Sequence, residues 1–316
     1  MRHIQGIQSL SSPIDGAVLT LGNFDGVHLG HQMIVREVQA LARQRHGTSV
    51  VLTFDPPPGR VLGKATSPQI ATLSDRACWM AGLGVQLFVL ETFTPALAAM
   101  TAEQFVEQLL ETYIRPKAIF IGYDFCFGRE RRGDVHFLRS YYEPRGVDVY
   151  QLGPLTLGLP GGGEEIISSS NIRRLVLEGQ VERAAAMLGR PHELHGVVVH
   201  GDARGRTLGF PTANIVPETE LLPAHGVYAG FLRVGDARLP AVTNIGNRPT
   251  FSGATVTVES HVLDFQGDLY HQPVVLELVS RLRSEQKFSG LDALKAQIAQ
   301  DVLQARRRLG LEEGAS

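Results

Sequence analysis

A glycine-rich segment at residues 22–31, Gly-Asn-Phe-Asp-Gly-Val-His-Leu-Gly-His, joins an apolar run to a helical pattern that includes Ile34. Backbone N–H groups and the positive end of a helix dipole would face a ligand above this segment, which suits phosphate. His28 and His31 are three residues apart, so both rings leave one face of the first helical turn and could donate N–H groups to a phosphate. A zinc half-site or ordinary surface residues are the alternatives at this spacing. No third His or Cys follows at ligand spacing, so phosphate binding is the favoured interpretation.

A second segment at residues 201–214, Gly-Asp-Ala-Arg-Gly-Arg-Thr-Leu-Gly-Phe-Pro-Thr-Ala-Asn, has a similar character. Its three glycines would let a loop wrap around phosphates. Thr212 and Asn214 offer oxygen atoms, which suit a hard cation such as Mg²⁺. A plain Gly/Pro-rich turn is the structural alternative. Because the two segments lie in regions of different secondary-structure rhythm, the sequence predicts two active sites on two domains.

Short apolar runs alternate with helical patterns in the first half of the chain, which predicts a parallel sheet with crossover helices on both faces. The runs are residues 17–21, 50–54, 85–90, 118–121 and 147–152. Helices are expected around 34–41, after a capping box of Thr101 and Gln104, over 133–142, and over 172–178 and 182–188. Gly189 and Pro191 close the last of these, and the domain boundary is predicted near this helix end, between residues 186 and 187.

The second half is rich in β-type runs separated by Gly, Pro, Asn and Asp, which predicts an antiparallel barrel or sandwich. The runs are residues 194–200, 226–234, 239–245, 255–265 and 274–281. One amphipathic helix follows, because apolar residues from Leu291 to Val302 recur at helical spacing after a Ser289 cap.

The composition sets limits on partners and location. The chain has 316 residues and a formal net charge of −2, which gives no broad attraction to nucleic acid. The start has no apolar core of signal-peptide length and no run approaches a membrane span, so we expect a cytoplasmic protein without a membrane partner. Cys78 and Cys126 are expected to be reduced, buried thiols. The sequence is compatible with a homo-oligomer.

Taken in their order along the chain, the motifs resemble those of known enzyme families. His-x-Gly-His after a strand resembles the nucleotidyltransferase superfamily, which includes class I aminoacyl-tRNA synthetases. The longer match decides, because residues 22–28, 122–128 and 167–173 resemble the adenylyltransferase half of prokaryotic bifunctional riboflavin kinase/FMN adenylyltransferases, and residues 201–214, 226–228, 244–250 and 258–264 resemble the kinase module. The resemblance covers nearly the whole chain. It implies conversion of riboflavin to FMN and of FMN to FAD, with ATP and Mg²⁺, by a Rossmann-like nucleotidyltransferase domain (1–186) and an antiparallel flavokinase β-barrel with a terminal helix (187–316).

The resemblance also implies roles in the first domain. His28 and His31 would stabilise the α-phosphate and the leaving group. The ATP site would comprise Gly22, Asn23, Phe24, Asp25, Gly30, Ser168, Ser169, Ser170 and Arg173, although simple helix capping is an equal alternative for the serines. Asp124 and Phe125 would bind flavin, but alternation of Phe125 with Phe127 also fits core-facing strand residues.

In the second domain the resemblance makes Glu259 the base that accepts the proton of the ribityl hydroxyl. An exposed strand glutamate is the alternative. ATP and Mg²⁺ would be bound by Gly201, Gly205, Thr207, Thr212 and Asn214, with Thr212 as the metal ligand.

Several positions depart from the family pattern, and two of them bear on phosphate binding; two other classes of protein are alternatives. Pro57 stands where His is frequent and Asn171 where Arg is common, so each removes a possible phosphate donor. A tRNA-synthetase-like enzyme would need a Lys-rich second signature, which this chain replaces by residues 167–173. A flavin-binding sensory module would tolerate loss of Glu259 and Thr212.

Overall fold

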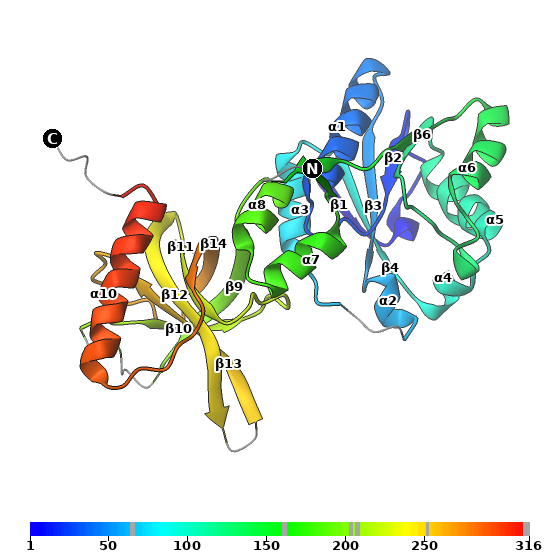
Figure 1. Cartoon of the computed structure of the whole chain (residues 1–316). Coiled ribbons are helices and arrows are strands. Elements are labelled where there is room, and N and C mark those ends of the chain that lie inside the picture. Colours follow the sequence, from blue (N-terminus) through cyan, green and yellow to red (C-terminus); the bar gives the residue numbers. More distant parts are fainter. Residues whose placement is uncertain (64–66, 160–162, 202–204, 206–208, 251–252, 312–316) are drawn as a thin grey trace. The chain divides into compact units, whose positions relative to one another are not determined.

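The structure is a computed structural model of the chain, and it describes residues 1–63, 67–159, 163–201, 205, 209–250 and 253–311 (Figure 1). The chain divides into two compact units. The first comprises Met1–Ser67 and Thr72–Ser168, and the second comprises Pro68–Ala71 and Ser169–Ser316.

The first unit contains a six-stranded parallel sheet with the order β1-β4-β3-β2-β5-β6. The strands are β1 (Arg2–Gln5), β2 (Val18–Leu21), β3 (Ser49–Asp55), β4 (Leu87–Thr92), β5 (Ala118–Gly122) and β6 (Asp148–Leu152). The five predicted strands are confirmed, and β1 is a sixth strand, not predicted, at one edge of the sheet. The strand order reverses at β2, and in open parallel sheets ligands bind beyond the carboxyl ends of the strands at such a switch point.

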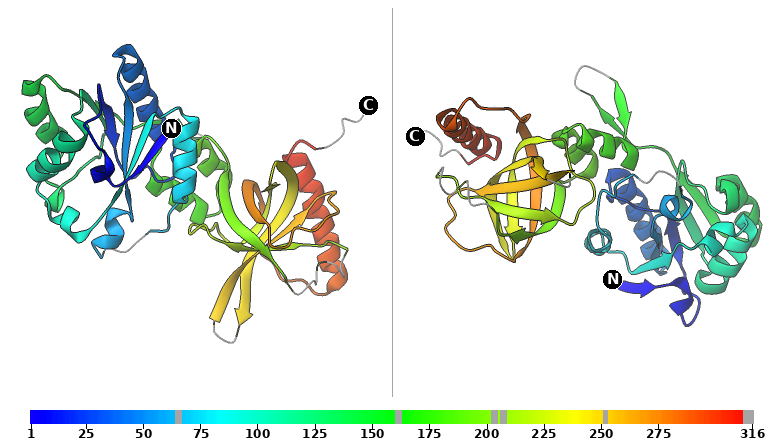
Figure 2. Two further views of the ribbon diagram at one scale, coloured as in Figure 1. Left: turned by 180° about the vertical axis from the view of Figure 1, so that it is seen from behind. Right: turned by 90° about the horizontal axis from the view of Figure 1, so that it is seen from below.

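Helices cover both faces of this sheet, as predicted (Figure 2). They are α1 (Leu29–Gln44), α2 (Pro58–Val61), α3 (Leu73–Gly82), α4 (Pro95–Ala99), α5 (Ala102–Phe105), the π-helical segment Val106–Ile114 and α6 (Val135–Tyr142), with 3₁₀ turns at Ile7–Ser9, Arg129–Arg131 and Glu143–Arg145. The capping box of Thr101 and Gln104 is present. Side chains of α1 and α3 pack on one face, and those of α5, the π-helical segment and α6 pack on the other. A two-stranded hairpin, β7 (Thr156–Gly158) and β8 (Glu164–Ile166), stands apart from the sheet.

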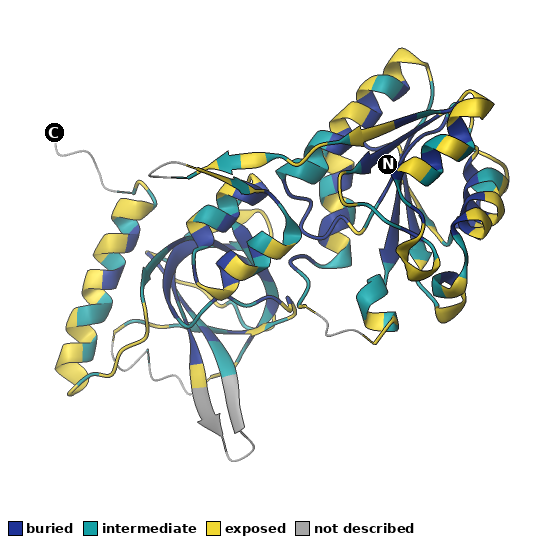
Figure 3. Cartoon of the chain, turned by 45° about the vertical axis from the view of Figure 1, so that its right-hand side comes forward, coloured by how far each residue is buried: buried dark blue, intermediate teal, exposed yellow. Residues whose placement is uncertain are grey.

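The second unit contains a closed barrel of six strands, with the order β10-β13-β12-β11-β14-β9. The barrel prediction is therefore confirmed. The strands are β9 (His192–Val199), β10 (Ala213–Pro217), β11 (Gly226–Val234), β12 (Ala237–Thr250), β13 (Gly253–Val262) and β14 (Pro273–Arg283). Strand β10 was not predicted. Figure 3 shows buried residues along the barrel strands and along the strands of the first unit's sheet.

Helix α10 (Leu291–Arg308) lies on the outside of the barrel. Arg283 on β14 donates Nε and Nη2 hydrogen bonds of 2.8–3.1 Å to the buried Asp301 carboxylate, which ties the helix to the barrel. The predicted Ser289 cap is wrong: Gly290 is the N-cap residue, and no side chain caps the helix.

Helices α7 (Ser169–Leu177) and α8 (Val181–Leu188) belong to the barrel's compact unit. The Glu182 carboxylate on α8 accepts hydrogen bonds from the Ser280 hydroxyl at 2.7 Å and from the Arg281 backbone N–H at 2.9 Å. The compact units therefore divide after Ser168, and the boundary of the catalytic domains between residues 186 and 187 stays a prediction.

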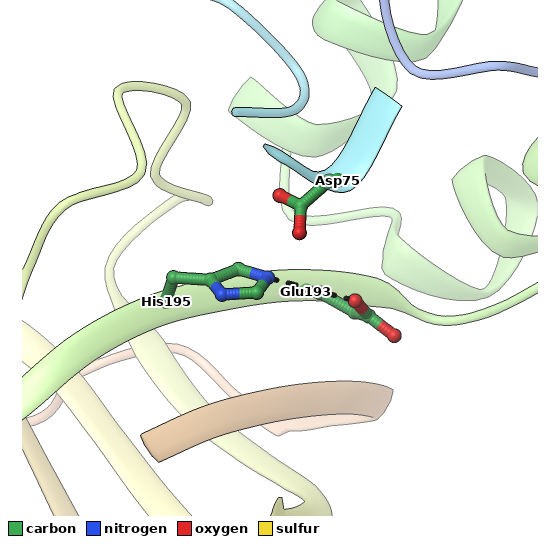
Figure 4. Close-up of side chains that lie close together, drawn as sticks. All are labelled: Asp75, Glu193 and His195. Atoms are coloured by element: carbon green, nitrogen blue, oxygen red, sulfur yellow. Dashed lines mark ion pairs between the residues drawn. The ribbon is translucent and has the colours of Figure 1, made fainter. Parts of the chain in front are cut away.

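An ion-pair network lies on the outer face of the barrel. His195 Nε2 is 3.7 Å from a Glu193 carboxylate oxygen on the same strand (Figure 4). Arg233 joins Glu193 to the buried Glu277, at 3.1 and 2.9 Å. Because Glu193 and Glu277 are thus paired with a cation, we assign this network to holding adjacent strands together.

Candidate active sites

The first candidate site is the loop that joins β2 to α1. Three of its residues have positive φ: Phe24 (48°), Gly26 (79°) and Val27 (40°). Such conformations cost about 1–3 kcal/mol for each non-glycine residue and persist only where the surroundings enforce them. The Phe24 and Val27 side chains are buried against Met80 of α3, so packing enforces this geometry. The loop is therefore a rigid structure at the sheet's switch point.

His28 and His31 come together as predicted. His28 is the N-cap of α1, and its Nδ1 accepts a hydrogen bond from the His31 backbone N–H at 3.3 Å. This bond leaves the proton of the neutral ring on Nε2 of His28. The two rings stack with centroids 3.6 Å apart. The histidines therefore form one unit at the positive end of a helix.

The pKa of His31 lies well below its ordinary value, first because the ring is desolvated and second because His28 is adjacent. His31 is thus neutral at physiological pH, and its Nδ1 has no hydrogen-bond partner within the part of the chain that the structure describes. A neutral imidazole can still donate one N–H to a phosphate, and a bound anion would favour its protonation.

Gly30 has a defined reason for being glycine. A Cβ there would lie 3.2 Å from the His28 ring and 3.7 Å from the Ile167 carbonyl oxygen. Segment 167–173 therefore begins beside the histidine loop. Gly22, at the other end of the loop, lies against the Phe24 ring, since a Cβ on Gly22 would be 3.4 Å from that ring.

The serine segment opens a helix, as predicted. Ser169 is the first residue of α7, and Arg173 donates an Nε hydrogen bond of 2.9 Å to the Pro68 carbonyl. Ser168 ends the first compact unit, whereas Ser169, Ser170 and Arg173 belong to the second. Their role in binding ATP stays a prediction, as does the effect of Asn171.

Asn23 and Asp25, the other predicted site residues of this loop, are held by the residues around them. Asp25 is buried, and the Asn23 carbonyl accepts hydrogen bonds from the Thr53 hydroxyl at 3.2 Å and from Arg76 Nη1 at 2.9 Å. Arg76 was not among the site residues predicted from the sequence. Pro57 is the N-cap residue of α2, where it cannot donate a hydrogen bond.

Asp124 and Phe125 follow β5, the neighbour of β2 in the sheet. Asp124 is exposed at this edge, which is compatible with ligand contact. The Phe125 ring stacks on Phe127 at 5.8 Å and packs against the core, which favours the alternative interpretation of that residue. Flavin binding by this pair stays a prediction.

The second candidate site lies on the outer face of the barrel around Glu259. Its neighbour Ser260 is fully buried and shares a hydrogen bond of 3.0 Å with the Thr243 hydroxyl, so Glu259 must point outward. Glu259 lies directly opposite Asn214 on β10 and opposite Asn244 on β12. Directly opposed side chains are about 5 Å apart at Cβ, so two amides flank the half-buried carboxylate. Asn244 was not predicted as a site residue.

The glycine-rich segment folds against these residues. A Cβ at Gly201 would lie 2.1 Å from the Asn214 amide nitrogen, and one at Gly205 would lie 3.2 Å from the Thr212 hydroxyl oxygen. Gly201 is therefore required for close approach to the Asn214 side chain, and Gly205 for close approach to the Phe210 carbonyl oxygen, which would lie 2.4 Å from such a Cβ. Thr207 lies outside the described residues. Asn214 is on strand β10, so the predicted irregular segment begins to pair one residue after Thr212.

The side chains of this second site offer oxygen ligands, namely the Thr212 hydroxyl, the Asn214 amide oxygen and the Glu259 carboxylate. Such a set fits a hard divalent cation better than a transition metal. A carboxylate at a glycine-rich loop can also accept a proton from an alcohol. The site can therefore support phosphoryl transfer to a hydroxyl group.

The cysteines are both free, with Cys126 half-buried and Cys78 exposed. The prediction that both thiols are buried is wrong for Cys78, because the face of α3 that carries it is turned to solvent. Among the described residues, no helix combines the length and apolar character needed to cross a membrane.

Comparisons with known proteins match the two parts of the chain to two different family models. A family model described as FAD synthetase matches residues 11–171, and one described as riboflavin kinase matches residues 188–309. The bifunctional riboflavin kinase/FMN adenylyltransferase of Escherichia coli (strain K12) is 39% identical, with all of both chains covered. The protein of the same name from Bacillus subtilis (strain 168) is 34% identical, with 92% of each chain covered.

One solved structure covers both units. A Streptococcus pneumoniae protein described as a macrolide-efflux protein is 31% identical and superposes with a TM-score of 0.85, covering 97% of this chain and 99% of that one. The two family models match successive parts of the chain, and the two bifunctional relatives match it over nearly its full length. The chain belongs to the family of bifunctional riboflavin kinase/FMN adenylyltransferases.

Proposed function

We propose that the barrel site phosphorylates riboflavin to FMN and that the β2–α1 loop site adenylylates FMN to FAD, each with ATP. The observation that carries this assignment is the position of Glu259. A carboxylate that can accept a proton stands at the barrel's glycine-rich loop, where the acceptor would be an alcohol. The other loop presents a pair of histidines that can act as donors, which suits an acceptor that is already an anion.

In the kinase step, the ribityl 5′-hydroxyl attacks the γ-phosphorus of ATP and ADP leaves. Glu259 accepts the hydroxyl proton as the new O–P bond forms. Asn214 and Asn244 flank this carboxylate and would hold it in place. Gly201 and Gly205 let the loop backbone approach the phosphates.

In the adenylyl-transfer step, a phosphate oxygen of FMN attacks the α-phosphorus of ATP and pyrophosphate leaves. This reaction needs alignment and charge stabilisation, without a protein nucleophile. His28 donates from Nε2, because its Nδ1 is occupied by the His31 N–H. His31 would donate its ring N–H to the same charge. Ser168, Ser169, Ser170 and Arg173 would hold the triphosphate, and Asp124 the flavin.

Mg²⁺ fits the oxygen donors of the kinase site, and Thr212 is its proposed ligand, with Asn214 and Glu259 adjacent. The ion would neutralise phosphate charge when ATP binds. A cytoplasmic location agrees with two free cysteines.

The test is to incubate the protein with riboflavin, ATP and Mg²⁺ and to separate flavins and nucleotides. ADP equal to the sum of FMN and FAD reports the first step, and pyrophosphate equimolar with FAD reports the second. Replacing Mg²⁺ by excess chelator should stop FMN formation. Persistent FMN formation in chelator would contradict the metal assignment, and absence of both flavin products would contradict the function.

A further inference from the structure

Arg76, on helix α3 of the first compact unit, is only 1% exposed and is the largest fully buried side chain in the described chain. A guanidinium remains charged at any physiological pH, so its burial must be compensated by partners. Its hydrogen-bond acceptor, the Asn23 carbonyl, lies in the loop that carries the histidines.

The guanidinium links the ends of two neighbouring strands. Nη1 donates a hydrogen bond of 2.9 Å to the Asn23 carbonyl, just after β2, and Nη2 lies 3.5 Å from a carboxylate oxygen of Asp55, the last residue of β3. The Thr53 hydroxyl donates to the same Asn23 carbonyl at 3.2 Å. Arg76 therefore fixes the peptide that precedes the strained Phe24.

The direction of this peptide matters for the site. In a trans peptide the carbonyl and the following N–H point in opposite directions, so the Phe24 N–H points away from Arg76. Two hydrogen bonds to the carbonyl polarise the peptide and strengthen that N–H as a donor. The buried cation thus acts on the phosphate loop through the backbone.

Two of the three guanidinium nitrogens of Arg76 are not used as hydrogen-bond donors within the described residues. Nε and Nη2 make no hydrogen bond to any residue that the structure describes, and the Asp55 side chain is 40% exposed. Desolvation lowers the pKa of Arg76, while Asp25 and Asp55 oppose that effect. The carboxylates of Asp25 and Asp55 thus compensate the buried charge, so Arg76 acts on the site by fixing the geometry of the loop.

We propose that Arg76 is a positioning residue of the adenylyl-transfer site, which holds the Asn23–Phe24 peptide in the orientation that binds the ATP phosphates. The inference rests on the proposed function of this loop. Arg76 acts through Asn23 and Asp55, so it supports binding and alignment of ATP without contacting the reacting atoms. The barrel site does not depend on it.

The test uses full-length protein with Arg76→Met, which removes the charge, and Arg76→Lys, which keeps a cation but cannot reach both partners with one nitrogen. Arg45→Met is the control, because Arg45 is an exposed arginine of the same unit, paired with Asp148. FAD formation from supplied FMN is measured against ATP concentration, and FMN formation from riboflavin is measured on the same samples.

For Arg76→Met, we expect the KM for ATP in FAD formation to rise about fivefold or more and kcat to fall about 10- to 100-fold. Arg76→Lys should lie between it and the wild type, Arg45→Met should match the wild type, and FMN formation should be unchanged in all. Loss of folded protein alone would lower the apparent kcat without raising KM, so that result would overturn the proposal.

If Arg76→Met does not fold, Arg76→Lys decides: a raised KM for ATP supports the proposal, and wild-type values of both constants overturn it. A wild-type protein that forms FMN but no FAD would instead refute the proposed function of the loop, and the inference with it.

Discussion

Replacing Glu259 by Gln should stop riboflavin phosphorylation and leave FAD synthesis from supplied FMN intact. Gln keeps the size and the hydrogen-bonding capacity of the side chain but cannot accept a proton from the ribityl hydroxyl. The two flanking residues, Asn214 and Asn244, are amides, so neither can replace the lost base. The substitution therefore isolates proton transfer from binding.

The size of the effect follows from the environment of Glu259. A positioned general base contributes about 10²- to 10⁴-fold to a rate, so kcat for FMN formation should fall by that factor. The side chain is half-buried on an outer strand face, and Gln can still bond to the amides, so folding should lose less than about 1 kcal/mol. That corresponds to a shift in Tm of less than about 4 °C for this unit.

The assay is FMN and ADP formation from riboflavin and ATP, run beside FAD formation from FMN on the same enzyme. Glu218→Gln is the control, because Glu218 is an exposed glutamate just after β10 in the same unit. A Glu259→Gln enzyme that retained more than a tenth of its FMN formation would refute the assignment of the base. Loss of both activities with a normal Tm would contradict two separate sites.

Two further predictions concern the histidine loop. His28→Ala combined with His31→Ala should lower FAD formation at least about 100-fold, because two donors to the developing charge are lost, while FMN formation stays at the wild-type level; normal FAD accumulation would show that the histidines have another role. Because the folded-state pKa of His31 is depressed, the unfolded chain binds more protons below pH ~6.5, so this residue contributes stability that is present above that pH and is lost as pH falls. Thermal unfolding between pH 5.5 and 7.5 should therefore show a smaller pH dependence for His31→Gln than for the wild type, by at most about 1.4 kcal/mol per pH unit, and an equal dependence in both proteins would refute the depressed pKa.

The strands of the sheet were predictable because buried parallel strands read as continuous apolar runs, as in Val18–Leu21. The barrel followed from regularly spaced β runs. Strand β10 (Ala213–Pro217) was not predicted because it is short, follows Pro211 and ends at Pro217, and prolines usually mark a loop. The Ser289 cap failed because sequence shows a capping residue type but not where the helix begins.

The motifs identified the two loops and the residues within them, but not their partners. Asn244 meets Glu259 only through the register of β12 and β13, which no local pattern encodes. Arg76 was not identified because arginine is rarely fully buried, so its residue type favours an exposed position. The one local signal was the capping box of Thr72 and Asp75, which places the N-cap of α3 one turn before Arg76.

Mixing two defective enzymes tests most directly whether the chain holds two independent centres. Glu259→Gln alone should give no FAD from riboflavin, and the double alanine variant of His28 and His31 should stop at FMN. Together, with riboflavin, ATP and Mg²⁺, they should form FAD, because FMN released by the second enzyme is a substrate for the first. A mixture that accumulates no FAD, although each variant retains its own remaining activity, would contradict the account.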